Sequence, residues 1–278
     1  MYDLRGRVAV VTGAGGERGI GRAIATRLAR DGADIIVNDI VENPYPDGET
    51  GWAGIPQVVT EIEALGRQAV GILADVADAS QVDNMIRQAV DRFGHIDILV
   101  NNAASRPGPD RVPVVELTED AWDTVQRVNL KGTFLCSRAV AREMIRRGRG
   151  GRIIIISSVA GRRGAACFAA YCVSKFGLIG FTQALALELA PHRINVNAVC
   201  PSLVDTERVA FIASALAPEG VSAEEYREQM LRGRASEIPL GRVAMPEDIA
   251  RMVAFLASPE ADYLTGLSVS VAGGSHMS

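Results

Sequence analysis

The sequence predicts an α/β fold of the doubly wound kind, in which a parallel sheet of seven strands carries helices on both faces. Short apolar runs alternate along the chain with segments whose apolar residues recur at helical spacing. The runs are apolar throughout, which is typical of strands buried on both faces of a parallel sheet. The chain has 278 residues, of which 48% are hydrophobic, and no linker or internal repeat divides it. We therefore expect residues 1–278 to form a single domain.

Each expected strand is a short apolar run that ends in a turn or at a polar residue. The first, RVAVVT, leads into a Gly-rich turn, and the third leads to Asp75. In chain order the strands are expected at Arg7–Thr12, Ala33–Val37, Gln68–Ala74, Ile96–Asn101, Arg152–Ser157, Arg193–Val199 and Leu267–Val271. Right-handed crossovers between these strands give the doubly wound arrangement.

The segments between the strands have helical periodicity. The second helix is closed by Gly66, and the fourth is long enough to bend near Gly132. The helices are expected at Gly19–Arg30, Ile55–Leu65, Ser80–Phe93, Thr118–Arg147 and Phe168–Leu189. Two segments exceed the usual loop length, namely the Pro- and Gly-rich insertion 42–54 and the mostly helical segment 203–237. Ligands of such folds bind at the carboxyl ends of the strands, so we expect 203–237 to be a substrate lid.

Composition excludes several functions. With 29 basic and 33 acidic residues the net charge is −4, so no basic excess is available for nucleic acid or anionic lipid. No apolar run approaches the roughly 18 residues of a membrane span, and the first five residues do not resemble a signal peptide. Four cysteines without metal-ligand spacing and only three histidines predict no metal site. We expect a cytoplasmic protein in a reducing compartment.

The turn after the first expected strand has the pattern of a phosphate-binding loop. Gly13, Gly15 and Gly19 let the backbone approach a pyrophosphate, and Ile20 lies where the following helix offers free amides. A Gly-rich turn alone is also consistent with a tight left-handed turn. Its place directly between strand and helix favours a dinucleotide site.

Acidic residues at the ends of the next two strands bear on which dinucleotide binds. Asp39, 20 residues beyond Gly19, can accept hydrogen bonds from the adenosine ribose and would repel a 2′-phosphate. Arg18 argues for NADP, because a guanidinium there could pair with that phosphate. An exposed arginine is easily redirected, whereas a carboxylate facing a phosphate is costly, so we expect NAD and consider NADP less favoured. Asp75 either reaches the adenine or caps its loop.

One tyrosine–lysine pair stands out because the chain has only two lysines, Lys131 and Lys175. Tyr171 and Lys175 are spaced i, i+4 in an expected helix, so their side chains share one face. A nearby ammonium favours the phenolate, which makes a phenol useful as a base at neutral pH. Taken alone, the pair is more typical of an ordinary surface contact, but Lys175 is one of only two lysines and follows a turn of the dinucleotide-binding kind.

Together these motifs resemble those of the short-chain dehydrogenase/reductase family, in its single-domain branch that includes 3-oxoacyl-carrier-protein reductases and secondary-alcohol dehydrogenases. Ser158 precedes Tyr171 by 13 residues, the spacing usual in that family. The matches run nearly end to end and comprise the Gly-rich turn, Asp75-Val76, Asn101-Asn102-Ala103-Ala104, Asn129, Ile156-Ser157-Ser158, Tyr171-x-x-x-Lys175, Asn197 and Pro201.

The resemblance implies a Rossmann-like fold, a nicotinamide cofactor and a catalytic set of four residues. Tyr171 would be the general acid/base, and Lys175 would favour its phenolate and bind the nicotinamide ribose. Ser158 would hold the substrate oxygen, and Asn129 would bind a water that links Lys175 to solvent. The cofactor-binding set would comprise Gly13, Gly15, Arg18, Gly19, Ile20, Asp39, Asp75, Val76, Asn102, Ala103, Tyr171, Lys175, Pro201, Val204 and Thr206.

Two departures from the family pattern concern backbone turns. Five residues rather than the usual three separate Gly13 from Gly19, so the phosphate loop is expected to be wider. Pro201 is followed by Ser202 where the family usually has glycine, so that turn must avoid a positive φ or accept some strain. Neither departure removes a chemical group.

The expected reaction is NAD-dependent hydride transfer between nicotinamide and a secondary alcohol or ketone of medium size. The alternatives are an NADP-dependent 3-oxoacyl-thioester reductase and a non-catalytic NAD-binding protein of the same fold. Family members are usually homotetramers, and a homodimer is the alternative. A largely apolar substrate pocket is expected from Cys167, Phe168, Phe211, Ile212, Leu216, Tyr226, Met230 and Leu231.

Overall fold

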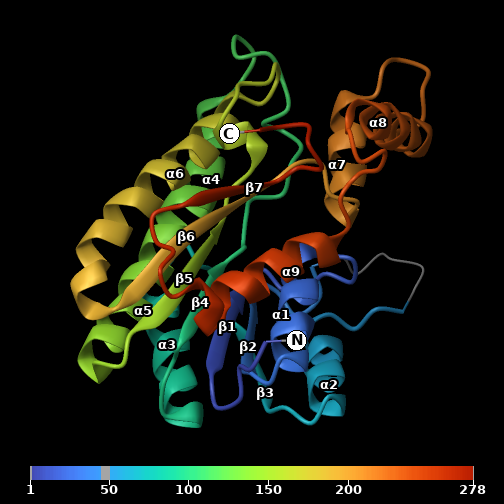
Figure 1. Cartoon of the computed structure of the whole chain (residues 1–278). Coiled ribbons are helices and arrows are strands. Elements are labelled where there is room, and N and C mark those ends of the chain that lie inside the picture. The colour runs from blue at the N-terminus through green and yellow to red at the C-terminus, as the bar shows by residue number, and fades with distance from the viewer. Residues whose placement is uncertain (1, 45–50, 278) are drawn as a thin grey trace.

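The computed structural model describes residues 2–44 and 51–277, which form one seven-stranded sheet flanked by helices (Figure 1). The strand order is β3-β2-β1-β4-β5-β6-β7, and every neighbouring pair is parallel. The strands are β1 (Val8–Thr12), β2 (Asp34–Asp39), β3 (Ala69–Leu73), β4 (Ile98–Asn101), β5 (Gly151–Ile156), β6 (Ile194–Pro201) and β7 (Ser268–Val271). The predicted fold class is therefore confirmed.

Two sets of helices cover the sheet. The set on one face is α1 (Ile20–Arg30), α2 (Ile55–Ala64) and α9 (Pro246–Ala257), with α9 against α1. The other face carries α3 (Ala79–Phe93), α4 (Glu119–Gln126), α5 (Thr133–Arg147) and α6 (Ala169–Leu189). The sequence analysis did not predict α9, whose buried Ile249, Val253 and Leu256 close the first core.

Successive residues of the central strands point into two different cores. In β1, Ala9 and Val11 belong to the core under α1 and α9, whereas Val8 and Val10 belong to the core under α3 and α5. All five β1 residues are buried, as the unbroken apolar run predicts. Burial on both faces fixes the register of the sheet, and with it the position of the strand ends that form the site.

The long helical segment after β4 is interrupted where the sequence suggested a bend. Between α4 and α5 the chain forms a π-helical segment, Arg127–Gly132, that includes Asn129. A Cβ on Gly132 would lie 2.8 Å from Cγ2 of Val76, so glycine allows this segment to pack against the loop after β3. Such π-helical turns are frequent at functional sites.

Among the described residues, one helical stretch is long and apolar enough to span a bilayer by length and composition, Ala169–His192. The expectation that no apolar segment approaches that length is wrong for this stretch. Its main part is α6, which packs along β6 and against α4 and contributes buried residues to the second core. Packing accounts for only part of its apolar composition, because 39% of its most apolar window is buried.

The segment expected as a lid stands beyond the carboxyl ends of the strands. It contains α7 (Glu207–Leu216) and α8 (Ala223–Glu237), which pack on each other and lie apart from the helices that cover the sheet (Figure 1). A β-bridge between Val204 and Ala244 fixes its base. The predicted insertion 42–54 lies partly outside the described residues.

Candidate active site

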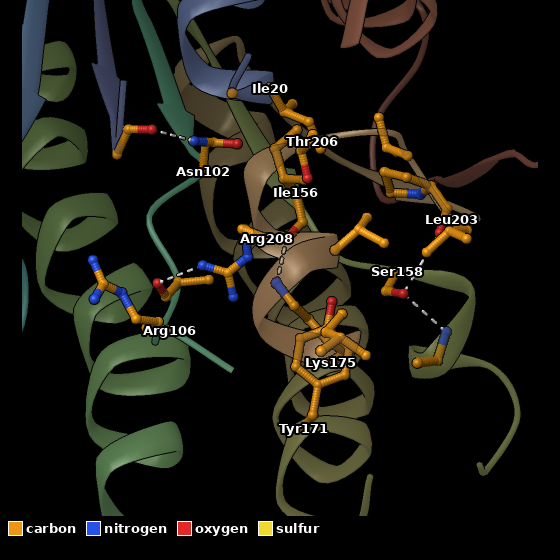
Figure 2. Close-up of a pocket in the computed structure, with 18 of the residues that line it drawn as sticks. Ile20, Asn102, Arg106, Ile156, Ser158, Tyr171, Lys175, Leu203, Thr206 and Arg208 are labelled. Carbon is orange, nitrogen blue, oxygen red and sulfur yellow. Dashed lines mark hydrogen bonds between the residues drawn. The ribbon is translucent and has the colours of Figure 1, made fainter. Parts of the chain in front are cut away.

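A cavity of about 890 Å³ opens at the carboxyl edge of the sheet, between the strand ends and the lid. Most of the residues that the sequence singled out line it: Gly13, Gly19, Ile20, Asp39, Asp75, Val76, Asn102, Ala103, Ser158, Tyr171, Lys175, Pro201, Val204 and Thr206. Gly15, Arg18 and Asn129 lie outside its lining. Figure 2 shows how Asn102, Ile20 and Tyr171, which are far apart in the sequence, converge on this space.

The glycine turn packs closely against the end of β4 and is hydrogen-bonded to it. Gly13 has φ +65°, and a Cβ there would lie 2.7 Å from Cα of Ala103, so only glycine fits. The side-chain amide of Asn102 donates to the carbonyls of Thr12 and Gly13, at 2.9 and 2.8 Å. The helix that follows begins at Ile20 with no side-chain cap, so its first amides face the cavity without an internal partner. This arrangement can hold a pyrophosphate.

Two hydrogen bonds hold the widened part of the turn in place at Gly15. The Gly15 amide donates to Oδ2 of Asp39 at 3.0 Å, and the Gly15 carbonyl accepts from the Trp52 indole at 2.7 Å. The guanidinium of Arg22 lies 4.9 Å from the centre of the Trp52 ring. In this structure the amide and the carbonyl of Gly15 are thus both engaged by protein groups, and the expectation that Gly15 binds the cofactor stays a prediction.

Asp39 is oriented by the turn it faces. Its two carboxylate oxygens accept from the amides of Gly15 and Ile40, and burial raises the pKa of the carboxyl group despite these bonds. It lines the cavity at the end of β2. Arg18, in contrast, is exposed, and its backbone amide donates to the Glu207 carboxylate. The structure therefore brings the carboxylate, and not the Arg18 guanidinium, to the cavity.

Asp75 lines the cavity and also caps its own loop. One oxygen accepts from the Ala77 amide at 2.8 Å, and the other pairs with Arg127 at 2.9 Å. Pro201 and Ser202 form the turn after β6 without a positive φ at Ser202, so the missing glycine creates no strain there. Within residues 2–44 and 51–277, no cluster of three His, Cys, Asp or Glu side chains could hold a metal ion.

The first turns of α6 deliver the tyrosine–lysine pair to the cavity. Lys175 is buried, its Nζ donates to the Ile156 carbonyl at 2.8 Å, and it lies 5.6 Å from the centre of the Tyr171 ring. Burial lowers the pKa of Lys175 to about 7, and the nearby Arg208 guanidinium adds to this effect. Ser158 lines the same cavity at the end of β5, and its Oγ accepts from the Ala160 amide at 3.1 Å.

Asn129 is buried behind the cavity rather than facing it. Its Oδ1 accepts from the Ser105 amide and its Nδ2 donates to Oγ of Ser174, each at 2.9 Å, while Thr133 donates to its backbone carbonyl. Protein groups therefore occupy both ends of the side-chain amide, and the expectation that Asn129 binds a water linking Lys175 to solvent stays a prediction. Asn129 instead ties the loop after β4 to α6, which carries Tyr171.

Two arginines that lie close to the tyrosine–lysine pair in the cavity were not identified from the sequence. Arg208 on α7 donates to the carbonyls of Ala104, at 3.2 Å, and Ser105, and it points into the space between Asn102 and Lys175 (Figure 2). Arg111 is buried below Tyr171 and Phe168 in the loop before α4. In a chain with 29 basic residues, nothing in the local sequence distinguishes these two from exposed arginines.

The substrate end of the cavity is partly apolar. Of the side chains expected there, Phe168, Ile212 and Met230 line it, and Leu203, Val209 and Val159 join them. The remaining expected residues, Cys167, Phe211, Leu216, Tyr226 and Leu231, are not part of the lining. Of the six residues expected from the segment 203–237, two therefore line the cavity and four do not.

Comparison with known proteins agrees with this geometry. Residues 13–276 match the family model described as enoyl-(acyl carrier protein) reductase. The chain is 39% identical to galactitol 2-dehydrogenase of Agrobacterium fabrum, with 99% of each chain covered. It is 41% identical to a 3-oxoacyl-[acyl-carrier-protein] reductase of Staphylococcus aureus, covering 97% of this chain and 98% of that one.

A solved structure also matches this chain over nearly its full length. Carveol dehydrogenase from Mycobacterium avium, determined in complex with NAD, superimposes with a TM-score of 0.85 at 33% identity, and 99% of each chain is covered. The match over nearly the full length, together with the Ser158, Tyr171 and Lys175 side chains around one cavity, identifies the family. The chain belongs to the short-chain dehydrogenase/reductase family of oxidoreductases.

Proposed function

We propose that this enzyme transfers a hydride between NAD and a secondary alcohol or ketone, using Ser158, Tyr171 and Lys175. The observation that carries the proposal is that these three side chains line the same cavity as the glycine turn and the uncapped start of α1. A proton-transferring phenol and a dinucleotide-binding turn therefore share one continuous space. Bound NAD would supply the acceptor for the hydride that leaves the carbinol carbon.

Each residue has a distinct part in the proposed chemistry. Tyr171 takes the hydroxyl proton during alcohol oxidation and returns it during ketone reduction. Lys175, held by the Ile156 carbonyl, supplies positive charge that favours the phenolate. Ser158 donates a hydrogen bond to the substrate oxygen and keeps it in line with the phenol. Asn129 fixes the distance between the β4 loop and α6 and is a positioning residue in this scheme.

NAD is the cofactor that the adenosine end of the cavity favours. The Asp39 carboxylate lines that end, and a Cβ on Gly15 would lie 3.1 Å from Pro44 and 3.2 Å from the carboxylate, so the space around Asp39 is narrow. A 2′-phosphate there would meet a buried negative charge, which is costly. The remaining cavity-lining residues of the predicted cofactor set would hold the dinucleotide, with Val204 and Thr206 at its nicotinamide end.

The substrate we propose is a medium-sized secondary alcohol. The apolar side chains of Phe168, Ile212 and Met230 suit a carbon skeleton, and polar groups near Ser158 suit a hydroxylated one. Galactitol 2-dehydrogenase, a polyol enzyme by name, supports this class. The similarity to a 3-oxoacyl-[acyl-carrier-protein] reductase supports a second candidate, an NADP-dependent reductase of 3-oxoacyl thioesters.

We further propose a cytoplasmic homotetramer. Large apolar side chains are exposed on α5 and α6, including Phe134, Val173, Phe176 and Leu187, and Leu267 is exposed beside β7. Two separate apolar faces fit an assembly with two kinds of subunit contact. Light scattering on the purified protein tests this, and a monomeric mass would contradict it. The four cysteines are free, in keeping with a reducing compartment.

The substitution Tyr171→Phe tests the central proposal. Removing one hydroxyl leaves the ring in place, so NAD affinity should remain close to that of the wild type while turnover falls by about 10² or more. A panel of secondary alcohols with NAD, followed by NADH absorbance, supplies the substrate for the comparison. Full activity in the variant would contradict the assignment, and tight NAD binding with no turnover on any alcohol would favour the non-catalytic alternative.

A further inference from the structure

A second cation lies against the proposed catalytic tyrosine. The guanidinium carbon of Arg111 is 4.7 Å from the centre of the Tyr171 ring and 4.3 Å from that of Phe168. Arg111 lines the cavity and is only 3% exposed. It comes from the loop before α4, whereas Lys175 comes from α6 itself. Two cations on different elements therefore lie close to one phenol.

The surroundings of Arg111 are unusual for a charged side chain. Its Nη1 pairs with Oδ2 of Asp110, whose other oxygen accepts from the Gly108 amide at 3.2 Å. Its Nε is buried without a hydrogen-bond partner in the described part of the chain. A guanidinium buried with one carboxylate and an unsatisfied donor costs stability, so packing alone does not explain it.

Tyr171 and Arg111 are electrostatically coupled. Burial lowers the pKa of Arg111, while Asp110 and then Tyr171 raise it. The geometry agrees with this interaction, because the guanidinium lies 4.7 Å from the centre of the Tyr171 ring. The charged groups around the ring come from three elements: Lys175 on α6, the Asp110–Arg111 pair before α4, and Arg208 on α7.

We propose that Arg111 is a positioning residue that keeps Tyr171 oriented and favours its phenolate by a charge that does not titrate. This inference rests on the proposed function. It assigns Arg111 a part that Lys175 alone cannot fill, because an arginine stays protonated throughout the working range of the enzyme. The stacked guanidinium also restricts rotation of the ring on which it lies.

The charge on Lys175 changes with pH, so a second cation next to Tyr171 would have a function. Burial lowers its pKa to about 7 in the cofactor-free protein, so the ammonium loses its proton as the pH rises above neutrality. Alcohol oxidation releases a proton and is favoured in that same direction. Arg111 would therefore supply the positive charge next to Tyr171 under the conditions in which Lys175 supplies less of it.

The substitution Arg111→Met removes the charge and keeps an unbranched apolar side chain. We expect the midpoint of the pH dependence of kcat/KM for alcohol oxidation to move up by about one pH unit, since an opposite charge within 4–6 Å shifts ionisation by 1–3 units and Asp110 offsets part of it. Below the midpoint, kcat/KM should fall about tenfold. Arg111→Lys keeps the charge and should restore most of this loss.

Asp110→Asn should shift the midpoint of the pH dependence in the opposite direction. It leaves the guanidinium without its counter-charge, so the midpoint should move down. A purely structural role would not shift the midpoint in opposite directions for two neighbours. Asp110→Asn also decides the question by itself where Arg111→Met does not yield folded protein, because an unmoved or raised midpoint would overturn the proposal.

Arg106→Met is the matched control. Arg106 also lines the cavity and lies over an aromatic ring, but that ring is Phe211, 4.6 Å away, which carries no hydroxyl. The control should leave the midpoint at its wild-type value. An equal midpoint in Arg111→Met and Arg106→Met would contradict the proposal.

A measurement without turnover separates this inference from the proposed reaction. Tyrosinate absorbance is titrated in the ultraviolet, and the signal of Tyr171→Phe is subtracted to isolate the one phenol. The isolated midpoint should rise in Arg111→Met and fall in Asp110→Asn even where no alcohol is oxidised. If the midpoints shift as expected and no substrate turns over, the proposed reaction fails while the Arg111 coupling stands. If the midpoints do not shift in an enzyme that oxidises alcohols, the Arg111 coupling fails while the proposed reaction stands.

Discussion

Replacing Lys175 with methionine should abolish turnover and yet stabilise the folded, cofactor-free protein at low pH. Burial lowers the pKa of this lysine from its ordinary 10.5 to about 7. Each pKa unit is worth about 1.4 kcal/mol, so the charged form is penalised by about 5 kcal/mol in the folded state. Methionine removes that penalty but leaves the Ile156 carbonyl without its donor, which costs about 1–3 kcal/mol. The net gain is about 3 kcal/mol.

The pH dependence of this gain has a definite sign. Between about pH 7 and about pH 10.5 the unfolded chain binds a proton at Lys175 that the folded chain has released, so wild-type stability rises with pH. Below both values the proton is bound in both states, and the penalty is present in full. Above both values the lysine is neutral in both states and the penalty is absent. The advantage of Lys175→Met should therefore be largest near about pH 6 and vanish or reverse near about pH 10.5.

Urea unfolding of the two proteins at several pH values measures the difference directly. Lys131→Met is the matched control, because Lys131 is exposed in the neighbouring π-helical segment. Its free energy of unfolding should stay within about 0.5 kcal/mol of the wild-type value. A Lys175→Met protein that is less stable than wild type near about pH 6 would refute the conclusion that Lys175 is held at the expense of stability.

Three further substitutions test the cofactor end. Asp39→Ala should narrow the preference for NAD over NADP, measured as the ratio of the two kcat/KM values, and an unchanged ratio would count against the carboxylate as the discriminating group. Gly13→Ala forces a Cβ to within 2.7 Å of the β4 loop at a positive φ, so calorimetry should show a lower Tm and NAD binding weakened by about tenfold or more; wild-type binding would be inconsistent with the close approach. Trp52→Phe removes the hydrogen bond to the Gly15 carbonyl and should weaken NAD binding about fivefold, whereas Trp122→Phe should leave NAD binding unchanged. Equal effects of the two substitutions would contradict a role of this hydrogen bond in holding the turn.

The sheet was predictable because its signal is local. Each strand is a short apolar run buried on both faces, and the helices between them have clear periodicity, so the order of elements followed from the chain itself. Boundaries differ by at most two residues at strand ends, as with β5, expected at Arg152–Ser157 and observed at Gly151–Ile156. The helix α9 was missed although its apolar spacing was present, because no expected strand preceded it after the segment 203–237.

The site was predictable where its residues are close in sequence. Tyr171 and Lys175 are one helical turn apart, so the i, i+4 pattern alone placed both side chains on one face of a helix. Asn129 was assigned a place in the site, but its partners Ser105 and Ser174 depend on how the loop after β4 meets α6. Tertiary packing, not local pattern, decided its orientation.

Other features of the site had no sequence signal. The contact between the Trp52 indole and the Gly15 carbonyl joins the insertion to the phosphate turn across 37 positions. Arg111 and Arg208 reach the cavity from two separate loop and helix segments. Arginine is so frequent in this chain that residue type alone could not distinguish a buried functional cation from a solvated one.

Transfer of deuterium from a labelled alcohol to the cofactor tests the account most directly. A secondary alcohol deuterated at its carbinol carbon is incubated with NAD and the enzyme, and the reduced cofactor is analysed by NMR. The account predicts that deuterium appears at C4 of the nicotinamide on one face only, and that the rate of its appearance falls by about 10² in Tyr171→Phe. Deuterium that is lost to water, or transfer that proceeds unchanged without the phenol, would contradict it.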